Sequence, residues 1–177
     1  SEFNQLHKNV QVKLEISHSE TVLTKLLEFN IDIAQLEANC YSDKVITYPW
    51  KKDELVVVAA PKYSLSKKRK LSLSDIGNAR WLLSEATSQT RGKLEEAIGG
   101  KIQPFLELDD TEAIKQATQA GLGISCLSRF VVGESIKNNK LIELKTPFLN
   151  LRREFHILIH KEKYQSMVMS EFIKKCA

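Results

Sequence analysis

The sequence predicts an α/β protein in which short strands alternate with amphipathic helices. Three observations carry this prediction. Apolar residues recur at helical spacing in several segments, and each segment follows a short run typical of a strand. The run DELVVVAAP at 53–61 is nearly continuous in apolar residues and closes on a proline, as expected for a strand buried on both faces. Strands that alternate with helices favour the α/β class.

The first strand and helix are expected over residues 10–30. VQVKLEI at 10–16 alternates apolar and polar residues, which predicts a half-buried strand. Ser17 and Glu20 have the spacing of a capping box, so a helix should start there. Its apolar face would be formed by Val22, Leu23, Leu26 and Leu27.

Asn30 suits the left-handed end of this helix, and IDIAQL then resumes as a strand. A strand, helix and strand in succession favour a parallel sheet with a right-handed crossover.

The middle of the chain repeats this pattern. LSLSDIG predicts a short capped helical turn, and RWLLSE predicts a strand. A helix should follow, with Ser88 or Thr90 as its cap and Gly99-Gly100 as its stop. Its buried stripe would consist of Leu94, Ala97 and Ile98. IQPFLEL is expected to form a strand interrupted by Pro104.

The stretch LDDTEAIKQATQAGLGIS at 108–125 contains two closely spaced glycines. Asp109 and Glu112 have capping-box spacing before an amphipathic helix. Gly121 is placed to end that helix with a positive φ, and Gly123 permits a close turn into the strand ISCLS. Both glycines are therefore expected to be scaffold residues.

The last third of the chain predicts a helix at RFVVGESIKNN, strands at KLIEL and REFHILIHK, and a C-terminal helix at YQSMVMSEFIKKC. The extended runs 45–61 and 154–161 flank the central strand–helix units. This arrangement favours two domains, with the chain leaving the first, building the second and returning.

Composition restricts the class of protein. The 177 residues are 42% hydrophobic and 27% charged, and no apolar run approaches the roughly 18 residues that a membrane span needs. No signal peptide opens the chain, and the initial SEF resembles a cloning remnant fused to an internal fragment. The net charge of +4 is a mild excess for a nucleic-acid surface. The KKRK cluster at 67–70 fits a solvated loop, with a phosphate or partner contact as the alternative.

Motifs for catalysis or metal binding are missing. Cys40, Cys126 and Cys176 fit neither a disulfide framework nor a metal knuckle, and their spacing gives no support for a redox role, so reduced thiols in the cytoplasm are expected. His156 and His160 lie in an expected strand, where they would stand about 13 Å apart and could not share an ion. No GxSxG, Walker A or GxGxxG pattern occurs. We therefore expect a binding protein with no cofactor and no enzymatic activity.

Three polar helix starts follow strands: SHSE, EATSQTR and LDDTE. Helix N-termini at the carboxyl ends of strands offer N–H groups and a partial positive charge to ligands. The first two starts suit a small polar or anionic ligand, whereas the acids of the third would repel an anion. The alternative for each hydroxyl is that it caps its own helix.

Three motifs, in this order and spacing, resemble the effector-binding domain of LysR-type transcriptional regulators. They are S-x-T-R at Ser88–Arg91, E-A-I-K-x-x-x-x-A-G-L-G-I at Glu112–Ile124, and L-S-R at Leu127–Arg129. ELVVVAAP and REFHILIHK add to the likeness, which covers nearly the whole chain from about Val10.

The resemblance implies a type II periplasmic-binding-protein-like fold: two α/β subdomains joined by two crossing strands, with a small effector in the cleft. The first subdomain would comprise residues 1–58 and 152–177, and the second residues 59–151. The expected effector-binding residues are Ser19 and its neighbour His18, the turn Thr87, Ser88, Gln89 and Thr90, and the lesser candidates Asp110 and Thr111.

Regulators of this family begin with a winged helix-turn-helix, which this sequence lacks, together with the first strand and helix of the first subdomain. DNA would therefore be contacted through that N-terminal domain and not through this fragment. An uncovered sheet edge or apolar face is expected near residues 1–30, with dimerisation, swapping or poor order there. The resemblance implies a homodimer or homotetramer.

Two further functions stay open. A stand-alone periplasmic-type solute-binding protein would share the fold, and a secretion signal upstream would distinguish it from a regulator. An enzyme of the prephenate dehydratase type has a Thr-Arg motif, which Thr90-Arg91 matches. Arg91 itself is expected to brace the helix through an ion pair or a carbonyl, with a ligand contact as the alternative.

Overall fold

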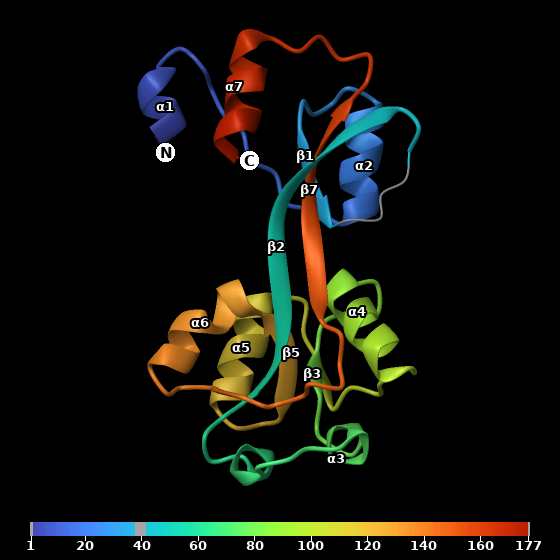
Figure 1. Ribbon diagram of the computed structural model, residues 1–177, viewed down its shortest axis with the longest axis vertical. Helices are drawn as coiled ribbons and strands as arrows, with labels where there is room; N and C mark the ends of the chain where they lie inside the picture. The colour runs from blue at the N-terminus through green and yellow to red at the C-terminus, as the bar shows by residue number, and fades with distance from the viewer. Residues whose placement is uncertain (1, 38–41, 177) are drawn as a thin grey trace. The chain divides into compact units, whose positions relative to one another are not determined.

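The computed structural model describes residues 2–37 and 42–176 (Figure 1). The chain forms two compact units: unit 1 contains residues 1–52 and 153–177, and unit 2 contains residues 53–152. The chain passes between them twice, once within strand β2 (Val45–Ala59) and once at the start of β7 (Arg152–His160).

The strands of unit 2 pair in two ways. Strand β2 is antiparallel to β5 (Ile124–Ser128) and to β6 (Ile142–Glu143). Strands β3 (Leu82–Leu83) and β4 (Leu106–Glu107) are parallel, and a parallel bridge from Trp81 to Ile124 joins β3 to β5. The predicted strand IQPFLEL is therefore reduced to two residues.

The continuous apolar run in β2 is explained by helices on both faces of the sheet. Val56 and Val58 pack in the cluster that includes α5 (Thr111–Gln119) and α6 (Arg129–Lys137). Leu55, Val57 and Ala59 point the other way, toward α4 (Gln89–Ile98) and α3 (Leu73–Gly77). Figure 1 shows α5 and α6 on one side of the strands and α4 on the other. The prediction of a strand buried on both faces is confirmed.

The two glycines after α5 have the predicted roles. Gly121 has φ +85° and follows the last helical turn, where its N–H donates to the Thr118 carbonyl at 3.0 Å. A Cβ on Gly123 would lie 2.2 Å from the backbone oxygen of Arg80. Gly123 is therefore required because two backbones approach too closely for any side chain.

Two helix ends of unit 2 match the prediction, and the start of α5 differs by one residue. Ser72 and Asp75 form a capping box on α3, and Gly99, with φ +83°, ends α4 as predicted. The cap of α5 is Asp110, not Asp109, because the Asp110 side chain accepts the Ala113 N–H at 2.7 Å. The helix starts one residue later than the capping-box spacing indicated.

In unit 1, helices cover both faces of strands β1 (Ala34–Glu37) and β7. Helix α2 (Ser19–Leu27) buries Leu26 against Leu36 and Leu158 on one face. Helix α7 (Met167–Cys176) buries Ile173 on the other. The short helix α1 (Glu2–Leu6) places Phe3 against the Phe172 ring, with the ring centroids 5.1 Å apart.

Several predictions for the start of unit 1 are wrong. Residues 10–16 form no strand: Leu14 and Ile16 are 80% and 90% exposed, and no described strand pairs with this segment. An alternating pattern makes a strand only where a neighbouring strand completes its hydrogen bonds. Strand β1 is consequently antiparallel to β7, not part of a parallel strand–helix–strand unit.

The ends of α2 also differ from the prediction. Its N-cap residue is His18, and the expected Ser17–Glu20 capping box does not form, because the helix begins one residue later than that box requires. The left-handed residue after the helix is Phe29, with φ 61°, and not Asn30. The Asn30 N–H donates to the Lys25 carbonyl at 2.9 Å, so the helix closes one residue earlier than expected.

Candidate ligand-binding site

Three helices of unit 2 begin at one edge of its sheet. Strands β3, β4 and β5 run in the same direction, so α4, α5 and α6 start beyond their carboxyl ends. Ligands of open α/β sheets bind at this kind of edge. The starts of α4 and α5 contain six of the expected site residues: Thr87, Ser88, Gln89, Thr90, Asp110 and Thr111.

The side chain of Arg91, in the first turn of α4, connects this helix to the ends of β3 and β4 by hydrogen bonds. Its Nε donates to Glu95 Oε1 at 3.0 Å, and its Nη1 donates to the Ser84 carbonyl at 3.1 Å and to Glu107 Oε2 at 2.7 Å. Its Nη2 donates to the Ile102 carbonyl at 3.2 Å. Arg91 is 8% exposed and therefore braces the helix, as expected, with its donors committed to the protein.

Glu95 is the buried partner in this network. Burial raises the pKa of its carboxyl, but hydrogen bonds from Lys101, the Ile102 N–H and Arg91 outweigh burial and lower that pKa to about 2. The carboxylate accepts Lys101 Nζ at 2.8 Å and Ile102 N–H at 3.2 Å. The network is therefore ionised at neutral pH and holds α4 rigidly against β3 and β4.

The first turn of α5 is capped by the carboxylate of its own N-cap residue, Asp110. Asp110 Oδ1 caps the first turn, and Asp109, Asp110, Thr111 and Glu112 are all exposed. A carboxylate already sits where an anionic ligand would meet the helix N–H groups. This corner is suited to water or to a cationic group, and poorly suited to an anion.

The start of α6 is also filled. Ser128 Oγ accepts the Phe130 N–H at 3.2 Å and donates to Asp53 Oδ1 at 2.9 Å. Asp53 is 6% exposed and comes from the neighbouring strand β2. Sequence reasoning missed this pair, although an Asp at the head of a buried apolar strand and the Ser of the L-S-R motif were both visible signals.

The start of α4 differs from the other two. Ser88 is the N-cap residue, yet its side chain makes no hydrogen bond to the first turn, all of whose residues the structure describes. Thr87 and Gln89 are exposed, and Ser88 and Thr90 are partly buried. The prediction that Ser88 or Thr90 caps this helix is therefore confirmed for the N-cap position of Ser88, but Ser88 forms no side-chain capping bond. The first N–H groups of an α-helix have no partner within the helix, and the Ser88 side chain accepts none of those of α4.

In unit 1, Ser19 is the first residue of α2 and is partly buried, and His18 is its exposed N-cap residue. The His18 side chain does not cap the helix. These two residues therefore form a polar helix start in unit 1.

The described part of the chain contains no metal-binding cluster. No group of three or more metal-ligating side chains occurs among the described residues, and none of their helices is long and apolar enough to cross a membrane. His156 and His160 lie in strand β7, as expected. Cys126 is a buried thiol, burial raises the pKa of Cys176, and Cys40 lies outside the described residues.

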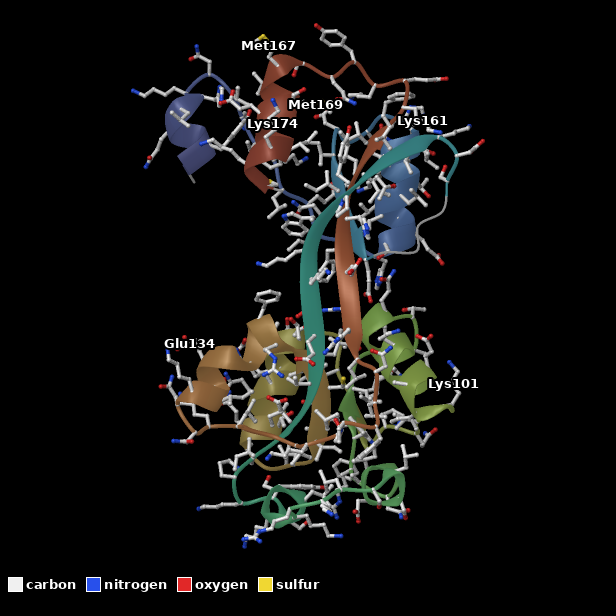
Figure 2. The ribbon with its side chains drawn as sticks, in the orientation of Figure 1. Lys101, Glu134, Lys161, Met167, Met169 and Lys174 are labelled. Atoms are coloured by element: carbon white, nitrogen blue, oxygen red, sulfur yellow. The ribbon has the colours of Figure 1, made fainter. Side chains whose placement is uncertain are left out.

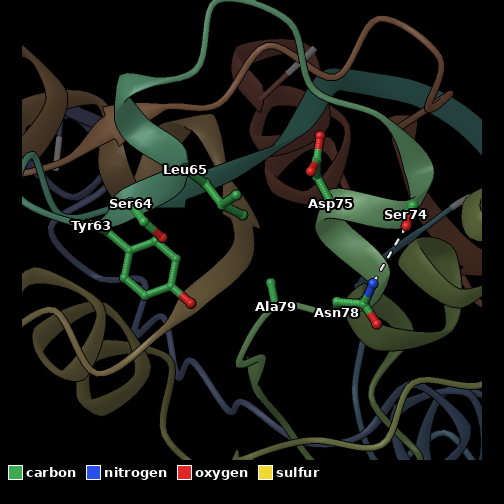
Figure 3. Close-up of a pocket in the computed structure, with 7 residues that line it drawn as sticks. All are labelled: Tyr63, Ser64, Leu65, Ser74, Asp75, Asn78 and Ala79. Carbon is green, nitrogen blue, oxygen red and sulfur yellow. Dashed lines mark hydrogen bonds between the residues drawn. The ribbon is translucent and has the colours of Figure 1, made fainter.

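A small pocket of about 270 Å³ lies elsewhere on unit 2, between the 3₁₀ turn η1 (Ser64–Lys67) and α3 (Figure 3). Its lining residues are Tyr63, Ser64, Leu65, Ser74, Asp75, Asn78 and Ala79. The Asp75 carboxylate, which Lys68 already pairs at 2.7 Å, makes this pocket unsuitable for a small anion. None of the expected site residues lines it.

The fold and its polar helix starts define a two-unit α/β ligand-binding domain of the type II periplasmic-binding-protein-like class. The family model for the LysR substrate binding domain matches residues 1–177, and the chain therefore belongs to that family.

The relatives are transcriptional regulators. The chain is 34% identical over 173 residues to the HTH-type transcriptional regulator YeiE of Escherichia coli K12, which covers 96% of this chain and 59% of YeiE. It is 29% identical to the HTH-type transcriptional activator CmpR of Synechocystis, covering 97% of this chain and 58% of CmpR. The chain thus spans about three fifths of the length of these relatives.

Solved structures agree on the fold. The regulatory domain of CcmR from Synechocystis, in complex with 2-PG, has a TM-score of 0.86 at 22% identity, covering 99% of this chain and 86% of that one. The effector binding domain of QuiR, in complex with shikimate, has a TM-score of 0.79 at 19% identity, covering 98% and 84%. The stand-alone solute-binding alternative is not favoured by these relatives.

Proposed function

We propose that this chain is the effector-sensing part of a LysR-type transcription factor and that its effector is a small polar or anionic metabolite that contacts the start of α4. One observation carries the proposal: of the three helix starts at this edge of unit 2, only α4, within the described residues, lacks a side-chain cap of its own. Ser88 and the backbone N–H groups behind it would hydrogen-bond the ligand.

Arg91 supports the ligand site indirectly. Its bonds to Ser84 and Glu107 hold the start of α4 beside the ends of β3 and β4, so the donors are fixed before a ligand arrives. Thr87, Gln89 and Thr90 would shape specificity. Asp110 and Thr111 would contact only the neutral or cationic parts of a ligand, because Asp110 already fills its helix start.

In the whole protein, ligand binding would change the affinity for DNA through coupling between two sites, with the DNA bound by a helix-turn-helix domain like that of the relatives. Such a regulator would act in the cytoplasm as a homodimer or homotetramer, and it would catalyse no reaction. Family membership and the regulator relatives support the role in transcription.

A thermal-shift screen tests the proposal. The panel would contain 2-PG, shikimate, other small carboxylates, phosphate monoesters and uncharged polar metabolites. A compound that binds the native state raises the melting temperature. At a concentration of 100 times its Kd, it adds about 2.7 kcal/mol to the free energy of unfolding. Calorimetric titration of the best compound would then give its affinity.

Two variants make the screen decisive. Ser88→Ala should weaken binding by about 1–3 kcal/mol, the cost of a lost buried hydrogen bond. Ser74→Ala, an exposed serine on α3, is the matched control and should leave the affinity unchanged. Equal affinities for wild type and Ser88→Ala would remove Ser88 from the site.

Ser19→Ala and His18→Ala, titrated in the same way, test the helix start of unit 1.

A further inference from the structure

The positive charge of the chain is concentrated in one segment. Residues 61–80 contain six of its 26 Lys and Arg and one of its 22 Asp and Glu, which gives +5 for this segment and −1 for the rest of the chain. The cations are Lys62, Lys67, Lys68, Arg69, Lys70 and Arg80, and all six are exposed.

The fold gathers these cations at one end of unit 2. Ala59, at the end of β2, pairs with Ile124, at the start of β5, and the Ile124 N–H donates to the Arg80 carbonyl at 2.8 Å. Both ends of the segment are therefore fixed at the edge where β5 begins, opposite to the edge where α4, α5 and α6 start. We call residues 61–80 the basic segment.

Few of these charges are neutralised within the protein. Lys68 pairs with Asp75 at 2.7 Å, and the Arg80 guanidinium stacks on the Phe105 ring at 4.9 Å. Within the described residues, Lys62, Lys67, Arg69 and Lys70 form no ion pair with a carboxylate. Like charges this close repel one another, so a polyanion would gain free energy by binding here.

The chemistry of the surface favours nucleic acid over a protein partner. Protein interfaces have an apolar core, but Leu73, at 51%, is the one large apolar side chain of the basic segment that is markedly exposed among the described residues. Protein–DNA interfaces are more polar and strongly positive. Flexible lysines without a recognition helix contact phosphates and do not read bases.

We propose that the basic segment binds the phosphate backbone of duplex DNA without sequence preference. This departs from the expectation that DNA is contacted only through a separate N-terminal domain, and it is independent of the proposed effector site. In a regulator, such a contact would hold DNA that flanks the specific site.

The test uses this chain and a fluorescently labelled 30-base-pair duplex of arbitrary sequence, with anisotropy measured from 50 to 200 mM salt. Four phosphate contacts predict a log–log salt slope of about −3.6 and a loss of affinity of about 100-fold across that range. A triple variant, Lys67→Gln, Arg69→Gln and Lys70→Gln, should bind at least about tenfold more weakly at 50 mM and lower the slope by about 2.7.

The matched control removes the same charge from unit 1, where Figure 2 shows Lys161 and Lys174. Lys8→Gln, Lys161→Gln and Lys174→Gln together should bind within about twofold of wild type, since these exposed lysines lie outside the basic segment. Circular dichroism and melting temperature would verify that both variants fold.

Three results would overturn the proposal. The first is no binding at 50 mM salt with the chain at 100 µM, a test concentration of about ten times the Kd expected for non-specific contacts. The second is equal weakening in the triple variant and the control. The third is displacement of the duplex by polyglutamate at equal charge, which would indicate an acidic protein as the partner.

Discussion

The starts of α4 and α5 lie side by side at the edge of unit 2, yet they differ in what satisfies their N–H groups. Asp110 caps α5 with its own carboxylate, whereas Ser88 makes no cap on α4, whose first turn is fully described. Both N-cap residues have extended backbones, with ψ 126° and 128°. Their φ angles differ, at −65° for Ser88 and −110° for Asp110, so the two starts differ in backbone as well as in side chain. A helix whose own side chain caps its first N–H groups gains stability, whereas a helix without such a cap can bind a ligand at its start.

The largest expected effect comes from removing the residue that positions both starts. Arg91→Met should lower the free energy of unfolding by about 3–5 kcal/mol, because the buried Glu95 would lose one of its charged partners and the Ser84 and Ile102 carbonyls would lose their donor. Urea denaturation measures this. Lys93→Met, which breaks an exposed pair with Glu96, is the control and should cost less than about 1 kcal/mol. Equal losses would show that Arg91 does not brace the edge.

Low pH should lower the stability of the same edge of unit 2. The pKa of Glu95 is about 2 in the folded chain and about 4.5 unfolded, so the stability it contributes is fully present above pH 4.5 and is lost as the pH falls toward 2. The loss amounts to roughly 3 kcal/mol. Melting temperatures of wild type and Glu95→Gln between pH 7 and 3 measure it. The difference in melting temperature between wild type and Glu95→Gln should shrink as the pH falls. A constant difference would contradict the lowered pKa of Glu95.

A smaller effect separates the two helix caps directly. Asp110→Ala should cost about 1 kcal/mol of unfolding free energy, because the Ala113 N–H loses its acceptor. Ser88→Ala should cost less than about 0.5 kcal/mol, since no capping bond is lost. Chemical denaturation of both variants tests the pair. A larger loss for Ser88→Ala would mean that Ser88 caps α4 in solution.

A gain in stability of under about 1 kcal/mol should come from making α4 resemble α5. Ser88→Asp should gain about 0.5–1 kcal/mol, because a carboxylate at the N-cap interacts favourably with the helix dipole. The same substitution should abolish binding of an anionic effector found by the screen. Retained binding would place the ligand elsewhere, and denaturation together with titration separates the two readouts.

Local sequence predicted much of the framework of unit 2. The apolar run at 55–59, the stops at Gly99 and Gly121 and the capping box of α3 follow from side-chain size, burial and backbone freedom at single positions. Predictions that depended on a distant partner failed. Residues 10–16 have the pattern of a strand but no described strand beside them, and β1 pairs with β7 from the other end of the chain.

The candidate site divides in the same way. The sequence by itself determined which polar residues stand at the helix starts, because Ser, Thr and Asp follow short strands at 87–90 and 109–111. Only the tertiary structure decided which start is open. Capping depends on where a side-chain oxygen lies relative to the first N–H groups, and Asp53 reaches Ser128 only because β2 and β5 pair across 75 residues of chain.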